Sequence, residues 1–101
     1  MTVKVIALVT INEDAPRALA RYLEVTTPLL EEVGARITQR FEIGEGVVGD
    51  VPGQTVLVVD YPDRAAVDRV FGSAAYAAVR PIRDRAFLDY SVSVVTNAVP
   101  V

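Results

Sequence analysis

The sequence predicts an α+β fold in a single domain over residues 1–101, with the element order β-α-β-β-α-β. Three observations predict it. Four short segments are β-branched or alternate in polarity, two longer segments repeat apolar residues at helical spacing, and glycine or proline lies between them. A length of 101 residues leaves room for one core. A hydrophobic content of 51% excludes intrinsic disorder.

The first strand and helix occupy residues 3–33. Val3 to Ile11 is apolar and β-branched, as strands are. Asp14 is predicted to cap the following helix, with Pro16 in its first turn, and Gly34 to end it. The helix is predicted to place these residues in the core: Leu19, Tyr22, Leu23, Thr26, Leu30 and Val33. Pro28 within the helix is expected to bend it.

The second and third strands form a predicted hairpin. Residues 35–43 alternate between two faces, which places Arg36, Thr38, Arg40 and Glu42 on one face and Ile37, Gln39, Phe41 and Ile43 on the other. The apolar face is expected to lie under the helices. Residues 44–53 contain four glycines and read as the loop, and residues 54–61 are the third strand.

The second helix and the last strand complete the fold. Asp63 is predicted to cap a helix that Gly72 ends, with Ala66, Val67, Val70 and Phe71 as its apolar stripe. Ser73 can restart a helix over residues 74–80, which Pro81 is predicted to interrupt. Residues 81–88 are either helix or irregular, and residues 90–97 are the fourth strand. The order is that of the ferredoxin-like split βαβ pattern, with a four-stranded antiparallel sheet.

Both faces of the first and third strands are apolar, although two helices can cover only one face of the sheet. An open apolar face invites aggregation unless something covers it. The simplest cover is a second copy, so the sequence predicts a two-fold, barrel-like homodimer. Leu8 and Val58 are the residues expected to report on that contact, whichever of them lies away from the helices.

Composition excludes several function classes. The net charge of −3 offers no basic surface for nucleic acid. The absence of cysteine and histidine excludes thiol and imidazole nucleophiles, disulfides, zinc sites of the usual ligands and histidine-ligated haem. No glycine-rich nucleotide loop is present, so no cofactor is expected. No apolar run approaches the roughly 20 residues of a membrane span. A cytoplasmic location is the default expectation.

Several segments resemble a small bacterial family, domain of unknown function thirteen-thirty. They are Tyr61-Pro62-Asp63-Arg64-Ala65-Ala66, Phe71-Gly72-Ser73-Ala74-Ala75-Tyr76 and Val79-Arg80-Pro81-Ile82-Arg83, with Gly34-Ala35, Arg36 and Arg40 in the first half. The chain departs from the family at Val48-Gly49-Asp50-Val51, which lacks the family's tryptophan. The resemblance implies the dimeric α+β-barrel superfamily, whose branches include cofactor-independent monooxygenases, isomerases, cyclases and proteins without known activity. It supplies no agreed catalytic residue.

Two groups of residues are candidates for binding a small-molecule ligand. Arg40, with Thr38 on the same face, is placed to hold a carboxylate or enolate in the space between two sheets. The alternative is a structural ion pair with Glu42 or with an acid of the partner. Tyr76 and Arg80 lie four residues apart on one helix face, where they line a pocket mouth or hold the chain at Pro81.

Asp60 and Tyr61 are the candidates for catalysis. An aspartate at a strand end can act as a general base, and a tyrosine can donate to an oxyanion. The alternative is a turn aspartate and a packed tyrosine. The leading interpretation is a cofactor-independent homodimeric enzyme that isomerises, cyclises or oxygenates a small enolisable, polyketide-like or aromatic substrate. A non-catalytic ligand-binding or regulatory dimer is the alternative, so the sequence leaves enzymatic activity open.

Overall fold

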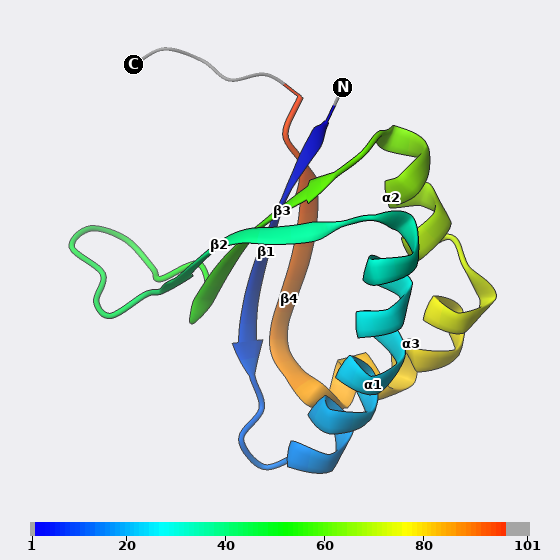
Figure 1. The fold of residues 1–101 in the computed structure, drawn as a ribbon. Coiled ribbons are helices and arrows are strands. Elements are labelled where there is room, and N and C mark those ends of the chain that lie inside the picture. The colour runs from blue at the N-terminus through cyan, green and yellow to red at the C-terminus, as the bar shows by residue number, and fades with distance from the viewer. Residues whose placement is uncertain (1, 97–101) are drawn as a thin grey trace.

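A four-stranded antiparallel sheet carries three helices on one face (Figure 1). The structure, a computed structural model, describes residues 2–96. Its elements are β1 (Val3–Ile11), α1 (Pro16–Val33), β2 (Arg36–Glu42), β3 (Thr55–Tyr61), α2 (Arg64–Phe71), α3 (Ala74–Ala86) and β4 (Phe87–Val94). The strand order β2-β3-β1-β4 is that of the ferredoxin-like fold, so the predicted fold class is confirmed.

Local capping chemistry sets most helix ends. Gly34 ends α1 with φ 78°, a left-handed conformation that costs glycine nothing. The Asp63 side chain accepts a hydrogen bond from the Ala66 N–H, and the Ser73 side chain accepts one from the Tyr76 N–H, so both predicted caps are confirmed. The predicted cap at Asp14 is wrong. Ala15 occupies the N-cap position without a side-chain hydrogen bond, and Pro16 opens the helix.

Helix α3 runs through Pro81 to Ala86, so the predicted interruption is wrong. A proline inside a helix removes one N–H and leaves the carbonyl four residues earlier, that of Ala77, without its helical partner. Ala77 is exposed, so water can satisfy that carbonyl. Strand β4 then starts at Phe87, earlier than predicted, and its predicted end at Asn97 lies outside the described residues.

A β-bulge at Thr38 changes which side chains of β2 face the helices. Ile37 pairs with Val59 and Gln39 pairs with the adjacent Val58, so Thr38 is an extra residue in β2. Beyond the bulge, Arg40 pairs with Leu57. Arg40 therefore shares the helix-side face with Ile37, while Phe41 lies on the opposite face. The prediction that Arg40 lies opposite both Ile37 and Phe41 is wrong for Ile37.

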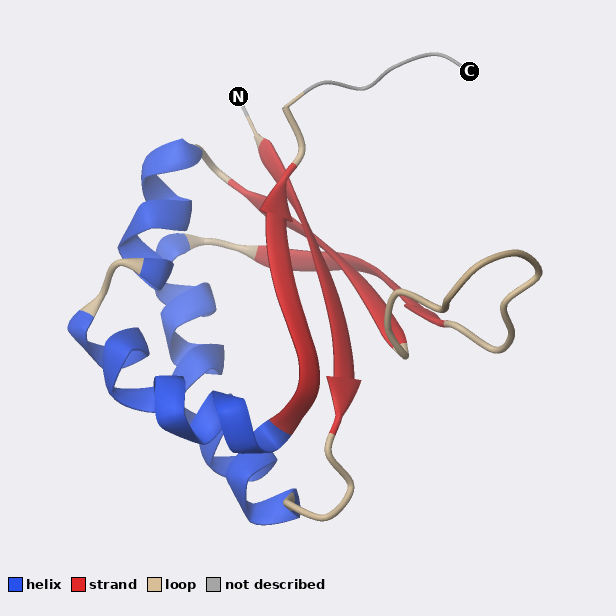
Figure 2. Cartoon of the chain, turned by 180° about the vertical axis from the view of Figure 1, so that it is seen from behind, coloured by secondary structure: helices blue, strands red, loops and turns tan. Residues whose placement is uncertain are grey.

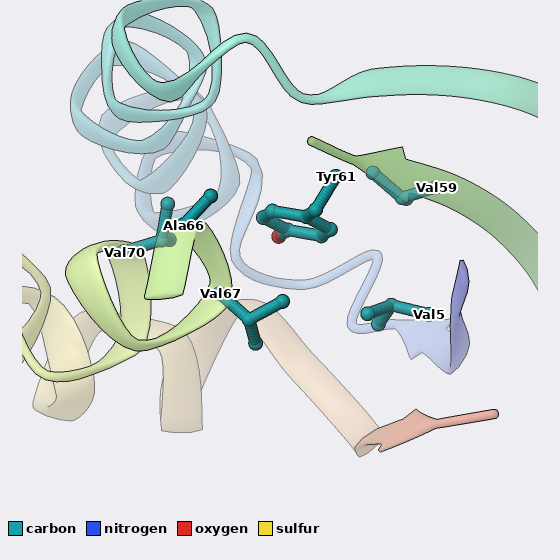
Figure 3. Close-up of a cluster of buried hydrophobic side chains, with 6 residues drawn as sticks. All are labelled: Val5, Val59, Tyr61, Ala66, Val67 and Val70. Atoms are coloured by element: carbon teal, nitrogen blue, oxygen red, sulfur yellow. The ribbon is translucent and has the colours of Figure 1, made fainter. Parts of the chain in front are cut away.

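The core lies between the sheet and α2. Its buried side chains come from the strands β1 and β3 and from α2: Val5, Val59, Tyr61, Ala66, Val67 and Val70 (Figure 3). The ring of Tyr61 lies between the strand valines and the α2 side chains. These contacts hold α2 against β1 and β3.

The other face of the sheet, which we call the outer face, carries no helix (Figure 2). Because opposed residues share a face, strand pairing places Ile6 with Val58 and Leu8 with Val56 on it, next to Phe41. Phe41 is 51% exposed. Leu8 and Val58 thus both lie away from the helices. Among residues 2–96, no helix is long and apolar enough to cross a membrane.

Candidate functional site

The sheet and helices enclose an incompletely filled space, which we call the inner cavity, of about 310 Å³. Aliphatic side chains of β1, α1 and β3 form most of its wall, among them Val5, Ala7, Val9, Leu19, Leu30, Leu57 and Val59. Its volume is at the lower end of the range for small-molecule sites, and a largely apolar wall with few polar groups is typical of them.

The mouth of the inner cavity lies between α1 and β2. Leu23, Ile37 and Arg40 line the cavity and yet are largely exposed. All of β2 is exposed because no helix covers it. Leu23, at 48% exposure, therefore borders an opening, and its predicted place in the core is wrong.

Three tyrosines from three different elements meet at the closed end of the inner cavity. Tyr22 comes from α1, Tyr76 from α3 and Tyr90 from β4. The hydroxyl oxygens lie 2.6 Å apart for Tyr22 and Tyr90, 2.9 Å for Tyr76 and Tyr90, and 3.4 Å for Tyr22 and Tyr76. We call these three residues the phenol cluster. It gives an apolar cavity one polar end.

Aromatic and cationic side chains hold the phenol cluster in place. Phe87 packs edge-on against Tyr22, and Phe71 packs edge-on against Tyr76. The Arg83 guanidinium lies 5.8 Å from the ring centre of Tyr76 and 5.1 Å from that of Tyr90. It also donates a hydrogen bond of 3.4 Å to the Tyr76 hydroxyl. Arrangements of this kind stabilise both the rings and the cation.

Burial raises the pKa of three of the tyrosines that line the inner cavity, Tyr22, Tyr61 and Tyr90. It is the main cause that raises the pKa of Tyr22 above its ordinary value, and negative charge on Tyr90 raises that pKa further. Burial also raises the pKa of Tyr90, although the hydrogen bond with Tyr22 opposes the shift. Burial and the nearby Tyr76 raise the pKa of Tyr61 to about 12. The hydroxyls of Tyr22, Tyr61 and Tyr90 are therefore hydrogen-bond donors at neutral pH and are not bases.

A second, more polar space lies on the other side of the phenol cluster, between the two C-terminal helices and strand β4. We call it the outer groove, and its volume is about 580 Å³. Five residues line both spaces and so form the partition between them: Phe71, Tyr76, Phe87, Tyr90 and Val92. Arg83 lines only the outer groove, and Tyr22 lines only the inner cavity.

The structure brings three of the six predicted site residues to the inner cavity. Tyr61, Tyr76 and Arg40 all line it. Tyr61 is buried at the core end, Tyr76 belongs to the phenol cluster, and Arg40 stands at the mouth with its side chain 62% exposed. The space around Arg40 is the helix side of one chain, and the prediction of a space between two sheets is wrong for this residue.

The other three predicted residues lie elsewhere. The Asp60 carboxylate points to the outer face, where it forms a 2.9 Å ion pair with Lys4. Thr38 is the bulge residue, and its hydroxyl donates to the carbonyl oxygen of Val58. Arg80 is exposed on α3 and lines neither the inner cavity nor the outer groove. The arginine that donates a hydrogen bond to the Tyr76 hydroxyl is Arg83.

Sequence reasoning missed Tyr90 and Arg83 and placed Tyr22 only in the core. One signal was available for Arg83, which is seven residues after Tyr76 and so two helical turns along the same face. Pro81 predicts a break in the helix, and a break would remove the shared helical face of Tyr76 and Arg83. All four tyrosines of the chain border the inner cavity. That coincidence appears only when the helices and β4 are packed together.

Replacing Arg40 with methionine is expected to change the free energy of unfolding by less than about 1 kcal/mol, because exposed ion pairs contribute little. The Arg40 Nε atom lies 3.3 Å from Glu42, and both side chains are largely exposed. Glu42 keeps a second partner, since the Thr55 hydroxyl donates to it at 3.0 Å. Urea unfolding measures the change. The matched control is Arg21→Met, which removes another exposed ion pair, with Glu24. A loss near 3 kcal/mol at Arg40 alone contradicts this description.

Solved structures and one protein family resemble the chain. A protein of unknown function from Rhodopseudomonas palustris is 19% identical, with a TM-score of 0.79 over 98% of this chain and 84% of that one. Rv0793 from Mycobacterium tuberculosis is 27% identical, with a TM-score of 0.64 over 99% and 98%. A dimeric protein of unknown function and ferredoxin-like fold from Bacteroides fragilis is 13% identical, with a TM-score of 0.57 over 93% and 94%.

No curated protein matches the chain. The family described as "Domain of unknown function (DUF1330)" matches residues 4–98, which is nearly the whole chain, and so confirms the resemblance seen in the sequence. The solved structures confirm the ferredoxin-like fold. The chain therefore belongs to the DUF1330 family.

Proposed function

We propose that this protein is a cofactor-independent enzyme that binds a small carbonyl compound in the inner cavity and stabilises its enolate. The observation that carries the proposal is the phenol cluster at the closed end of an apolar cavity. Hydrogen-bond donors fixed in a water-poor site stabilise the negative charge that forms on an enolate oxygen. Isomerisation, cyclisation and oxygenation of such substrates all pass through this anion.

The lining of the inner cavity narrows the substrate class further. Among the described residues that line it, the only charged side chain is Arg40, and none is a carboxylate. Asp60, the base that the sequence suggested, lies on the outer face. The proposed substrate is therefore a carbon acid that gives its proton to solvent readily, such as a 1,3-dicarbonyl compound or a hydroxylated aryl ketone. The protein then supplies binding, orientation and oxyanion stabilisation.

Proton–deuterium exchange tests this proposal directly. A panel of 1,3-diketones and hydroxylated aryl ketones is incubated with the protein in D₂O, and exchange at the acidic carbon is followed by nuclear magnetic resonance. The expected result is faster exchange with the protein than in buffer alone. Leu23→Trp narrows the mouth of the cavity and is expected to abolish the acceleration. Glu24→Trp, at the neighbouring exposed position, is expected to leave it intact.

A non-catalytic ligand-binding or regulatory role is the second candidate. The same absence of a carboxylate from the described lining favours it, because general-base catalysis needs such a group within reach. Native mass spectrometry of the purified protein identifies any small molecule that is retained. Binding that Leu23→Trp blocks, without accelerated exchange for any panel member, decides for this second function. If the protein retains no small molecule and accelerates no exchange, both candidate functions are contradicted.

We also propose that the working protein is a homodimer in which a second copy covers the outer face. Ile6, Leu8, Val56, Val58 and Phe41 make this face apolar, and no part of the described chain covers it. A structural neighbour of the same fold is described as dimeric. Two-fold pairing of two such sheets buries a surface of the size that stable dimers use, roughly 800 Å² for each chain.

A further inference from the structure

The bond from Arg83 and the three hydroxyl separations together assign a direction to the hydrogen bonds in the phenol cluster. Each phenol has one proton to donate, whereas an arginine side chain only donates. The Arg83 Nη1 atom lies 3.4 Å from the Tyr76 hydroxyl, so the Tyr76 oxygen is an acceptor in that bond. We assign the proton of Tyr76 to the Tyr90 oxygen, which at 2.9 Å is nearer than the Tyr22 oxygen at 3.4 Å.

The same reasoning assigns the proton of Tyr90 to the Tyr22 oxygen. Because Tyr90 accepts from Tyr76, its own proton is directed along the shortest contact of the cluster, 2.6 Å, to the Tyr22 oxygen. The proton of Tyr22 is left over. Its other neighbour in the cluster is the Tyr76 oxygen at 3.4 Å, which is the longest of the three separations. An incoming acceptor therefore displaces only the weakest contact.

The two spaces hold opposite ends of this chain of bonds. Arg83 lines the outer groove, Tyr76 and Tyr90 form part of the partition, and Tyr22 lines the inner cavity. The chain thus begins at a cation on one side of the partition and ends on the other side at the Tyr22 hydroxyl, whose remaining contact is the longest of the three. Hydrogen bonds in such a chain polarise one another, so the last donor is strengthened.

We propose that Tyr22 is the hydrogen-bond donor that binds the ligand's oxygen in the inner cavity, and that Arg83 is a positioning residue that orients Tyr22 through Tyr76 and Tyr90. This inference rests on the proposed function for the presence of a ligand in that cavity. It also specifies the ligand, which presents an acceptor oxygen and binds more tightly as an enolate or phenolate than as the matching ether.

The test compares two probes of similar shape. One is 4-nitrophenolate, an anionic acceptor whose absorption band shifts on hydrogen bonding, and the other is its methyl ether, 4-nitroanisole. The wild-type protein is expected to bind the phenolate more tightly and to shift its band. Tyr22→Phe keeps the ring and is expected to weaken phenolate binding roughly tenfold or more, as for loss of a charged hydrogen bond, and to leave the ether unaffected.

A double-mutant cycle separates this chain of bonds from simple attraction between Arg83 and an anion. Arg83→Met and Tyr90→Phe each break the chain at a different point, so each is expected to weaken phenolate binding and reduce the band shift. The double variant is expected to be no weaker than Tyr90→Phe alone, because the chain is already broken. Arg83→Lys retains one cationic donor and is expected to recover part of the loss. Arg80→Met, an exposed arginine of the same helix, is the control for charge.

The outcomes separate the inference from the proposed function. If Leu23→Trp blocks both probes but Tyr22→Phe leaves the preference for phenolate intact, the assignment of Tyr22 is wrong and the cavity function stands. Additive losses in the cycle overturn the role of Arg83 as a positioning residue. If the wild-type protein binds neither probe, both the inference and the proposed ligand class fail. Should Tyr22→Phe not fold, Tyr90→Phe tests the same chain of bonds with its ring retained.

Discussion

Replacing Leu8 with glutamate is expected to separate the proposed dimer into monomers or to prevent folding. Leu8 lies on the central strand β1 and faces outward, opposite Val56. In the proposed dimer its side chain is buried against the partner's sheet, where an unpaired carboxylate costs several kcal/mol. Light scattering is expected to show a mass near 22 kDa for the wild type, twice 10.9 kDa, and the mass of one chain for the folded variant.

The control for this substitution places the same charge on the opposite layer. Ala78 is exposed on α3, on the helix side of the molecule, so Ala78→Glu is expected to leave the mass and the melting temperature unchanged. A wild-type protein that is a well-folded monomer at micromolar concentration contradicts the dimer. So does a Leu8→Glu variant that keeps the mass of two chains.

Raising the pH above 10 is expected to destabilise the fold steeply. In an unfolded chain the tyrosines ionise with a pKa near 10, whereas burial raises the pKa of Tyr61 to about 12 and raises that of Tyr22 further. The folded state therefore holds these protons more tightly than the unfolded state does. Their contribution to stability is complete below pH 10 and is lost as the pH rises through 12.

Urea unfolding across this pH range measures the effect, and each retained proton contributes up to about 1.4 kcal/mol per pH unit. Tyrosinate absorbance follows ionisation independently, because the chain has no tryptophan and all four tyrosines border the inner cavity. Tyr61→Phe removes one titrating group and is expected to make the pH dependence shallower. Tyrosines that all ionise near pH 10 without loss of stability contradict the described burial.

The sequence by itself determined the order of the elements and most of their ends, because those features depend on neighbouring residues. Alternation of side chains marks the strands, and the side chains of Asp63 and Ser73 bond to backbone N–H groups three residues away. The apolar residues on both faces of β1 also predicted that helices alone would not cover the sheet. Each of these inferences needs only residues that are close in the chain.

The tertiary structure alone decided where the site lies. The bulge at Thr38 exists because of the register with β3, and it moves Arg40 to the helix side. The phenol cluster joins Tyr22 to Tyr90 across 68 residues, and no local pattern encodes that contact. Continuation of α3 through Pro81 brings Arg83 to the Tyr76 hydroxyl, because packing against α1 and β4 outweighs one missing backbone bond. Long-range packing, which no short stretch of sequence records, therefore placed the donors at the closed end of the cavity.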